Sequence, residues 1–559
     1  MSSPDGKVTV VFNGEIYNYR ELAKQLTGEG HRFQTTSDTE VLLKLYEARG
    51  MACVEELHGM FAFAVHDGRR NSLFLARDRM GKKPLYYCHP TRDSLLFASE
   101  LKGLAPLCRA AQMDLRVRDQ SIYDYLSFGV VPQPNSIYEG VHCLPPGNTA
   151  IWEGETLTLQ EYWSPSYEPK SELDYNEAQA EVRLRLHEAV RLRLRSDVPL
   201  GVLLSGGLDS SIVAYESVQA GVTDLQTFTI ATPGGLDESG VASRTAHTLG
   251  VENTVLPLEV DPLAGVQAVV HHYDQPFADS SAIPSMQIAR LARQHVTVVL
   301  NGDGGDEVFA GYRRYAAATL MPTSQRLAHL SAPAAKALSK FASNRRTPFG
   351  FAARFASGLG LDGPDRYLAW GSDLLRESDK DWAWQGQGCH PSERLVGAHA
   401  TAGLSSLDQM VATDVRLNLL SDLLVKMDMA TMASSLEARS PFLDQSVAEL
   451  GWHLPVSYRV KGFSTKRILR DAYREALPDE VVNGSKKGFE VPLAAWLAGP
   501  LAEIIHDTLG SPNAKVRAYV SAELIEGLLS STLLEDRNDK TILYSLLVLE
   551  LWLTQQGVS

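Results

Sequence analysis

Residues 196–211 read SDVPLGVLLSGGLDSS, and this stretch decides the fold of most of the chain. The apolar run that ends at Leu204 is typical of a buried strand, and a helix is predicted to begin near Asp209. Two glycines between them allow tight backbone turns, and three serines add hydroxyl donors. Backbone N–H groups and the helix N-terminus would then form an anion pocket that suits the pyrophosphate of ATP.

Asp209 stands inside this predicted anion pocket. A carboxylate beside phosphates would repel them unless a divalent cation lay between, so we interpret Asp209 as a Mg²⁺ ligand. The other common phosphate loop, GxxxxGK[ST], has no match in the chain. Taken alone, the segment leaves an alternative open, which is an ordinary Ser/Gly turn that caps a helix.

A second glycine-rich loop, NGDGGDE at 301–307, follows the apolar run VTVVL. Its spacing is not GxGxxG, because Glu307 takes the place of the last glycine, and this excludes a dinucleotide fingerprint. Asp303, Asp306 and Glu307 crowd three carboxylates together, which is costly unless a cation or an ammonium-bearing substrate compensates. The alternative is a polar turn with solvated acids. Because ligands bind at the carboxyl ends of strands in α/β sheets, both loops are predicted to line one site.

Helices and short apolar strands alternate around these loops. A long helix is predicted over 176–195, and the alternation indicates a doubly wound parallel sheet. The chain is expected to be almost entirely helical from about residue 320, with a buried helix over 542–553. The predicted strands are 201–204, 227–231 and 296–300.

Residues 1–165 have a different pattern, typical of an α+β domain. A strand over 7–12 is predicted to stop at Asn13 and Gly14. A helix over 39–49 should begin after Ser37, a good N-cap residue. Another helix is predicted at 19–29, and further strands at 61–66, 72–76 and 85–88.

The stretch 163–175 is rich in proline and charge and is the best linker candidate. We therefore predict one domain over 1–165 and a second over 175–559.

Composition limits the class of protein. The 559 residues are 44% hydrophobic and 21% charged, which is ordinary for a globular protein and excludes collagen-like or low-complexity chains. The net charge of −14, without a Lys/Arg run longer than two, argues against a nucleic-acid partner. Five cysteines without CxxC spacing predict buried thiols and a cytoplasmic protein. No segment is expected to span a membrane.

Together these residues resemble the glutamine-hydrolysing asparagine synthetase family in its bacterial form. The resemblance covers essentially the whole chain. The motifs that carry it are NGEIYNY at 13–19, TSDTEVLL at 36–43, GMFAFAVHD at 59–67, DRMGKKPLYY at 78–87, SDVPLGVLLSGGLDSS at 196–211, NGDGGDEVFAGY at 301–312, SLEARSPFLD at 435–444 and TKRILRDA at 465–472.

The resemblance implies a truncated glutaminase domain of the N-terminal-nucleophile type, built from antiparallel sheets. A doubly wound synthetase domain of the ATP-pyrophosphatase type, with a helical C-terminal part, would follow. The implied enzyme is a ligase of asparagine biosynthesis that uses ATP and Mg²⁺. Aspartate attacks the α-phosphate of ATP to give an aspartyl-adenylate and pyrophosphate, and ammonia then displaces AMP. Glutamine supplies that ammonia in the family, and a homodimer is left open.

The resemblance also assigns roles in the synthetase site. Asp303 would take part in forming the intermediate, and Lys466 would stabilise charge on the reacting phosphate. Asp209 and Asp306 would hold Mg²⁺. The predicted nucleotide contacts are Leu204, Ser205, Gly206, Gly207, Asp209, Ser210, Ile230, Asn301 and Gly302. Without the resemblance, Lys466 could equally belong to a solvated face of the helix predicted over 466–470.

Four residues match the family's glutamine site. The Asn13 side chain and the Gly14 N–H would form an oxyanion hole, and Glu15 and Asp38 would bind glutamine. The family's nucleophile is the cysteine of an N-terminal Met-Cys-Gly, which has no counterpart here. Ser2 is no substitute, because an extended strand would place it about 20 Å or more from Asn13.

Two explanations of this departure stay open. The recorded start is an internal methionine, or the protein naturally depends on ammonia. We favour the first, because residues of the glutamine pocket are retained. The chain as given is expected to use free ammonia, and glutamine alone should yield no asparagine.

Two other functions compete with asparagine synthesis. One is a related adenylating synthetase that forms an amide or lactam from another carboxylate. The other is a non-catalytic protein that retains the ATP-binding fold. The joint presence of Asp209, Asp303, Asp306 and Lys466 argues against the second.

Overall fold

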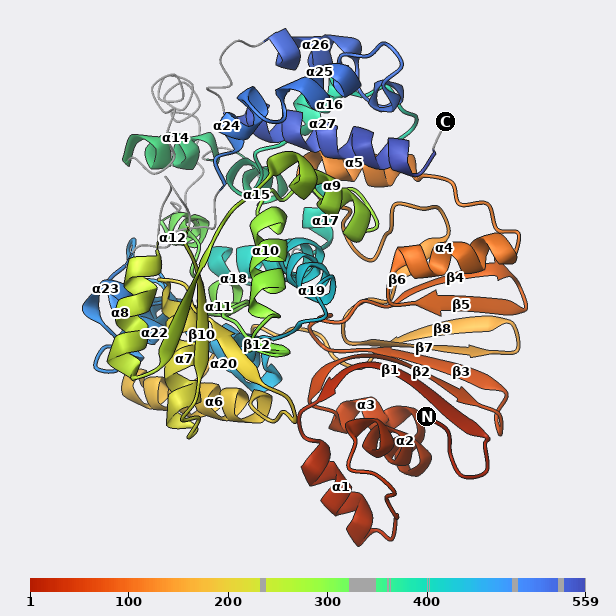
Figure 1. The fold of residues 1–559 in the computed structure, drawn as a ribbon, viewed down its shortest axis with the longest axis vertical. Helices are drawn as coiled ribbons and strands as arrows, with labels where there is room; N and C mark the ends of the chain where they lie inside the picture. The colour runs from red at the N-terminus through yellow and green to blue at the C-terminus, as the bar shows by residue number, and fades with distance from the viewer. Residues whose placement is uncertain are drawn as a thin grey trace.

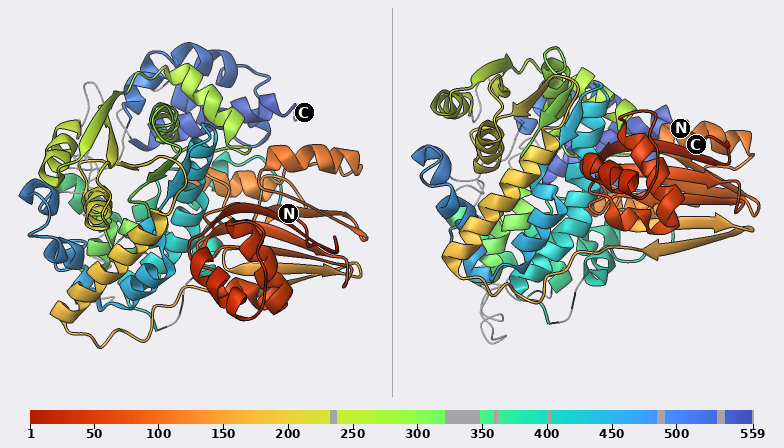
Figure 2. Two further views of the ribbon diagram at one scale, coloured as in Figure 1. Left: turned by 60° about the horizontal axis from the view of Figure 1, so that its bottom comes forward. Right: turned by 90° about the horizontal axis from the view of Figure 1, so that it is seen from below.

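The computed structural model describes residues 1–231, 238–320, 348–358, 361, 363–399, 401, 403–484, 491–530 and 537–557. Antiparallel sheets form its N-terminal part, and a parallel sheet with many helices forms the rest (Figure 1). In Figure 2 the N-terminal part, in red and orange, lies against one side of the remainder. No helix within the described ranges is long and apolar enough to cross a membrane.

The N-terminal part has two antiparallel sheets stacked face to face. Phe61, Phe63 and Val65 pack against the helices on one side of the larger sheet, whereas Ala62 and Ala64 pack toward the smaller sheet. The larger sheet is ordered β1 (Val8–Ile16), β2 (Gly59–Asp67), β3 (Ser72–Arg77), β7 (Asn148–Glu153), β8 (Thr156–Glu161). The smaller sheet is ordered β5 (Ser94–Ala98), β4 (Tyr86–Thr91), β6 (Val141–Cys143). The accompanying helices are α1 (Tyr19–Gly28), α2 (Asp38–Arg49), α3 (Cys53–Glu56), α4 (Leu101–Ala110) and α5 (Asp119–Phe128).

Strand β1 corrects one prediction. It does not stop at Asn13 and Gly14 but continues to Ile16, because both residues pair with β2 in register. Glycine is required at position 14, where φ is 146° and a Cβ atom would lie 2.1 Å from the carbonyl oxygen of Met60. The chain therefore keeps Asn13 and Glu15 on one rigid strand.

The residues before β1 correct a second prediction. The ammonium group of Met1 donates to the carbonyl of Val10 at 2.8 Å, and Ser2 pairs with Thr9. The N-terminal residues thus run back along β1. Ser2 lies opposite a residue four positions before Asn13, or about 13 Å away along the strand, rather than about 20 Å or more.

The parallel sheet is ordered β11 (Glu252–Pro257), β10 (Gln226–Ala231), β9 (Leu200–Leu203), β12 (Val298–Leu300), β13 (Glu437–Arg439). The three predicted strands are confirmed as β9, β10 and β12. The two outer strands, β11 and β13, were missed. Among the described residues after 320, β13 is the one strand in a part that is otherwise helical as predicted. β11 is an edge strand with exposed residues such as Val255, and β13 has only three residues in a charged segment.

Helices cover both faces of this sheet. Val202 and Leu300 belong to the same buried cluster as residues of α6 and α7, whereas Phe228 and Val299 cluster with residues of α10. The first helices are α6 (Tyr175–Arg193), α7 (Leu208–Gln219), α8 (Ser239–Leu249), α9 (Pro262–His272), α10 (Ala282–Ala292), α11 (Gly305–Phe309) and α12 (Arg313–Thr319).

The C-terminal helical part includes the predicted buried helix. Tyr544 and Trp552 of α27 are fully buried, which confirms that prediction. The helices are α14 (Pro348–Gly358), α15 (Gly363–Gly371), α16 (Glu377–Ala383), α17 (Glu393–Ala398), α18 (Ser406–Asp414), a π-helix (Val415–Leu423), α19 (Leu424–Met432), α20 (Gln445–His453), α21 (Val456–Arg459), α22 (Arg467–Ala472), α23 (Asp479–Val482), α24 (Leu493–Ala498), α25 (Ala502–Leu509), α26 (Ala522–Ser530) and α27 (Arg537–Gln555).

The predicted linker runs irregularly from β8 to α6 and is held down by Lys170. The Lys170 ammonium donates to the carbonyls of Tyr167 and Trp452 and pairs with Asp408 at 2.9 Å. Asp408 also pairs with Arg459, and both of these side chains are fully buried. A charged cluster of Lys170, Asp408 and Arg459 therefore fixes the linker to the C-terminal helices.

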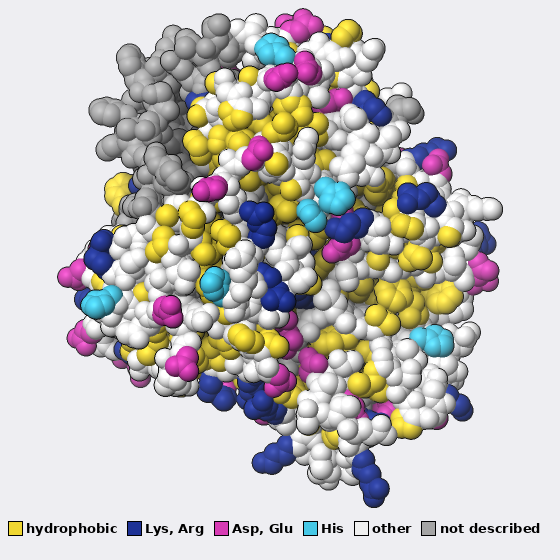
Figure 3. Space-filling model, viewed as in Figure 1, with side chains coloured by type: hydrophobic (Ala, Val, Ile, Leu, Met, Phe, Trp, Pro, Cys, Tyr) yellow, Lys and Arg dark blue, Asp and Glu magenta, His cyan; other side chains and the backbone are white. Residues whose placement is uncertain are grey.

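Surface charge and cysteines complete the description. On the face in Figure 3, Lys and Arg side chains are interspersed with Asp and Glu side chains. All five cysteines are free thiols. Four are buried as predicted, but Cys389 is partly exposed.

Candidate functional site

The two glycine-rich loops line one cavity of about 500 Å³ at the carboxyl ends of the parallel strands. Every residue predicted to contact nucleotide or metal, and both predicted catalytic residues, lie around it. They are Leu204, Ser205, Gly206, Gly207, Asp209, Ser210, Ile230, Asn301, Gly302, Asp303, Asp306 and Lys466. The structure thus brings the predicted residues together, while their ligands stay predictions.

The first loop is held in shape by its own serines. The Ser205 N–H donates to Ser210 Oγ at 3.0 Å, and the Gly207 N–H donates to Ser205 Oγ at 3.1 Å. The Ser211 hydroxyl donates to the Gly207 carbonyl at 2.8 Å, next to the start of α7. These bonds fix the backbone between β9 and α7, so that a helix N-terminus opens at the cavity.

Lys466 bridges the two predicted metal ligands. Its Nζ lies 2.5 Å from Asp209 Oδ2 and 2.6 Å from Asp306 Oδ1. Lys466 was predicted to lie on a helix. It instead directly precedes α22, with a left-handed φ of 51°. Burial lowers the pKa of this lysine, and the Asp209 carboxylate opposes that change. One buried cation therefore neutralises part of the charge of the two loops.

Asp209 keeps one carboxylate oxygen that could take a metal ion. Its Oδ1 atom is buried and accepts no hydrogen bond from any described residue. The described ranges contain no group of three or more His, Cys, Asp or Glu side chains suited to a metal. Mg²⁺ commonly takes one or two carboxylates and completes its shell with phosphate oxygens and water, so this pair of carboxylates fits it.

Glycine at position 311 makes this close approach possible. A Cβ atom there would lie 1.8 Å from Asp306 Oδ1 and 2.3 Å from Lys466 Cε. Any larger residue would therefore displace the contact between the lysine and the carboxylate.

Asp303 is positioned by a buried network that sequence reasoning missed. Asn301 Nδ2 donates to Asp303 Oδ2 at 2.6 Å, and the Ser440 hydroxyl donates to Asn301 Oδ1 at 2.8 Å. Lys82, from the loop between β3 and β4, donates to Ser440 Oγ at 3.2 Å and lies 4.0 Å from Asp303. The neighbouring Lys83 pairs with Asp428 at 2.7 Å. A buried lysine of the N-terminal part thus lies beside Asp303, and no local sequence pattern indicates this.

The residues predicted to bind glutamine lie at a different place, next to β13. Asp38, at the start of α2, accepts from the Ile16 N–H at 3.2 Å, and Asn13 Nδ2 donates to Ser99 Oγ at 3.3 Å. Glu15 pairs with Arg439 of β13 at 3.2 Å. Arg439 belongs to the SLEARSPFLD motif at 435–444, and it joins this group to the parallel sheet.

Glu15 should make stability depend on pH. Burial and the nearby Glu437 carboxylate raise the pKa of Glu15 from 4.5 to about 7. Because the folded state then holds this proton more tightly than the unfolded state, the stabilisation is complete below about pH 4.5 and is lost as the pH rises through about 7. We expect the unfolding midpoint of the wild type to fall relative to that of Glu15→Gln over this range, measured in urea. A constant difference between the two proteins would contradict the assignment.

Two family models together match most of the chain. Residues 181–554 match the family model described as asparagine synthase, and residues 1–163 match the glutamine amidotransferase domain. The chain is 32% identical over 568 residues to "Asparagine synthetase [glutamine-hydrolyzing] 1" of Bacillus subtilis, covering 99% of this chain and 86% of that protein. "Asparagine synthetase [glutamine-hydrolyzing] 3" of the same organism is 28% identical over 86% of this chain and 75% of its own length. "Amidase chyE" of Penicillium rubens is 29% identical, over 92% and 82% respectively.

Proposed function

Because this chain belongs to the asparagine synthetase family, we propose that it converts L-aspartate to L-asparagine through an aspartyl-adenylate. ATP would be cleaved to AMP and pyrophosphate, and ammonia would be the attacking nitrogen. Membership of the family supports ATP-dependent asparagine synthesis in general. The order of steps and the roles of single residues are parts of the proposal.

The observation that carries the proposal is the bridge from Lys466 to Asp209 and Asp306. An acid and a triphosphate are both anions, so their reaction needs fixed positive charge at the point where they meet. Lys466 supplies one such charge in the cavity lined by both loops. The serine-fixed loop and the N-terminus of α7 would hold the pyrophosphate portion of ATP.

Asp209 and Asp306 would hold Mg²⁺ between the protein and the triphosphate. When bound, the ion would neutralise phosphate charge and polarise the phosphoryl oxygens. Lys466 would keep its contact with the two carboxylates and stabilise charge that develops on the α-phosphate. Asn301 would keep Asp303 oriented toward the reacting groups.

A direct assay tests the proposal. The protein is incubated with ATP, Mg²⁺, L-aspartate and ammonium chloride, and pyrophosphate and asparagine are both measured. We expect both products in equal amounts, and no asparagine when aspartate or ATP is left out. A parallel arm replaces ammonium with glutamine. Failure of every arm to release pyrophosphate in response to aspartate would refute the proposal.

Lys82 should contribute to adenylation from the N-terminal part. In Lys82→Met the hydrogen bond to Ser440 is lost while most of the side-chain volume stays. Because a hydrogen bond from a charged group contributes about 1.5–3 kcal/mol, we expect ATP–pyrophosphate exchange to slow about tenfold. Lys82→Arg, which keeps the charge, should lose less. Equal rates in wild type and Lys82→Met would show that Lys82 does not position Asp303.

A further inference from the structure

A second cavity, of about 620 Å³, lies beside the first. The two cavities share a wall: Ser280 and Asp422 line the second, whereas their chain neighbours Ser281 and Leu423 line the first. Lys426 lines the first cavity, and its Nζ donates to Asp279 of the second at 2.7 Å. A group bound at this wall is therefore next to the site of the predicted adenylation.

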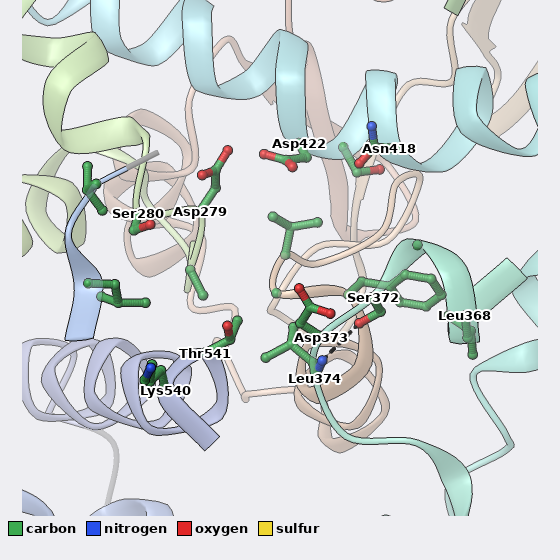
Figure 4. Close-up of a pocket in the computed structure, with 18 of the residues that line it drawn as sticks. Asp279, Ser280, Leu368, Ser372, Asp373, Leu374, Asn418, Asp422, Lys540 and Thr541 are labelled. Carbon is green, nitrogen blue, oxygen red and sulfur yellow. Dashed lines mark hydrogen bonds between the residues drawn. The ribbon is translucent and has the colours of Figure 1, made fainter. Parts of the chain in front are cut away.

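Two carboxylates face one another at this wall. Figure 4 shows Asp279 and Asp422 pointing toward each other at one end of the second cavity. Lys426 pairs with Asp279, so the cluster holds two acids and one base. The Oδ1 atom of Asp422 is buried and accepts no hydrogen bond from the described residues. Lys426 is thus the one cation that pairs with this cluster among the described residues, and Asp422 shares a hydrogen bond with Asp279.

The electrostatics favour a cation at Asp422. Burial and the neighbouring Asp279 raise the pKa of Asp422 to about 8, so this carboxyl group keeps its proton at neutral pH. An ammonium group placed between the two carboxyl groups would replace that proton and leave both acids ionised.

We infer that Asp279 and Asp422 bind the α-ammonium group of the acid that is adenylated. This inference rests on the proposed function and adds to it the residues that would select acids with a free amine. The acid would enter with its amine at the wall and its reacting carboxylate toward the cavity of Asp303 and Lys466. Beyond the wall the cavity continues to Leu374 and Asp373, which gives space for acids larger than aspartate.

The test compares L-aspartate with succinate, which has the same two carboxylates and lacks the amine. ATP–pyrophosphate exchange measures adenylation of each acid. We expect the wild type to prefer aspartate at least tenfold, because a site that pairs an ammonium group rejects the analogue without one. In Asp422→Asn, KM for aspartate should rise about tenfold while exchange with succinate stays nearly unchanged.

Asp373→Asn is the matched control. Asp373 lines the same cavity farther from the wall and pairs with Arg354 at 2.9 Å, so the preference for aspartate should persist in this variant. Thermal unfolding of the wild type and of both variants is the measurement that checks that each is folded.

Three results would overturn the inference. Asp422→Asn could lower exchange with both acids equally, or the wild type could use succinate as well as aspartate. Putrescine could raise the unfolding temperature of the wild type but not of Asp422→Asn while aspartate shifts neither, which would assign the site to an amine unrelated to the substrate. Absence of exchange with every acid would instead count against the proposed function itself.

Discussion

Replacing Lys466 with alanine is expected to slow adenylation by roughly 10²–10³, the loss typical of removing one fixed charge-stabilising donor. The structure gives two reasons for so large an effect. The ammonium group that would stabilise the reacting phosphate disappears, and Asp209 and Asp306 lose the cation that lies 2.5–2.6 Å from them. ATP–pyrophosphate exchange driven by aspartate measures the change.

The adjacent Arg467 provides a control with the same charge. Arg467 is 27% exposed and pairs loosely with Asp471 at 3.7 Å, outside the cavity. Arg467→Ala should therefore exchange at nearly the wild-type rate. If Lys466→Ala also folded and catalysed ATP–pyrophosphate exchange at the wild-type rate, Lys466 would have no part in the reaction. The proposed function would then lose its main structural support.

The largest effect on stability is expected from Asp408→Asn. Asp408 is the only anion paired with both Lys170 and Arg459 among the described residues, and the substitution keeps its shape but removes its charge. Breaking a buried ion pair by neutralising one partner costs about 3–5 kcal/mol, because the other charge is left uncompensated. A lower midpoint of urea unfolding, followed by tryptophan fluorescence, measures the loss.

An exposed ion pair supplies the comparison. Arg244 and Glu480 lie 2.7 Å apart, but their side chains are 60% and 39% exposed. Because exposed pairs contribute at most about 1 kcal/mol, Arg244→Met should move the midpoint little. Similar shifts in Asp408→Asn and Arg244→Met would mean that burial of the Lys170, Asp408 and Arg459 cluster contributes nothing.

The sequence predicts the centre of the parallel sheet well and its edges poorly. β9 and β12 are apolar, and β10 is buried at four of its six positions, because helices cover both faces of these strands. β11 has exposed positions, and β13 is only three residues long within SLEARSPFLD. Neither has the long apolar run by which a buried strand is identified.

The candidate site was likewise predicted only in part from the sequence. Loops that follow buried parallel strands meet at one sheet edge, so the common cavity of Asp209 and Asp303 follows from topology. Lys82 and Ser440 are brought next to Asn301 and Asp303 by contacts between segments more than 350 residues apart. Local patterns carry no information about such contacts. The left-handed backbone of Lys466 was likewise hidden, because its segment has ordinary helical composition.

Strand β13 is only three residues long, and two adjacent residues at its end contact two separate groups, one around Glu15 and one around Asn301. Arg439 contacts Glu15, and the next residue, Ser440, contacts Asn301. Insertion or deletion of a single residue just before this pair would shift the strand by one step and turn each side chain to the wrong side. Both contacts would then be lost at once, so the spacing of these few residues is constrained by two partners, Glu15 and Asn301, that lie far apart in the sequence.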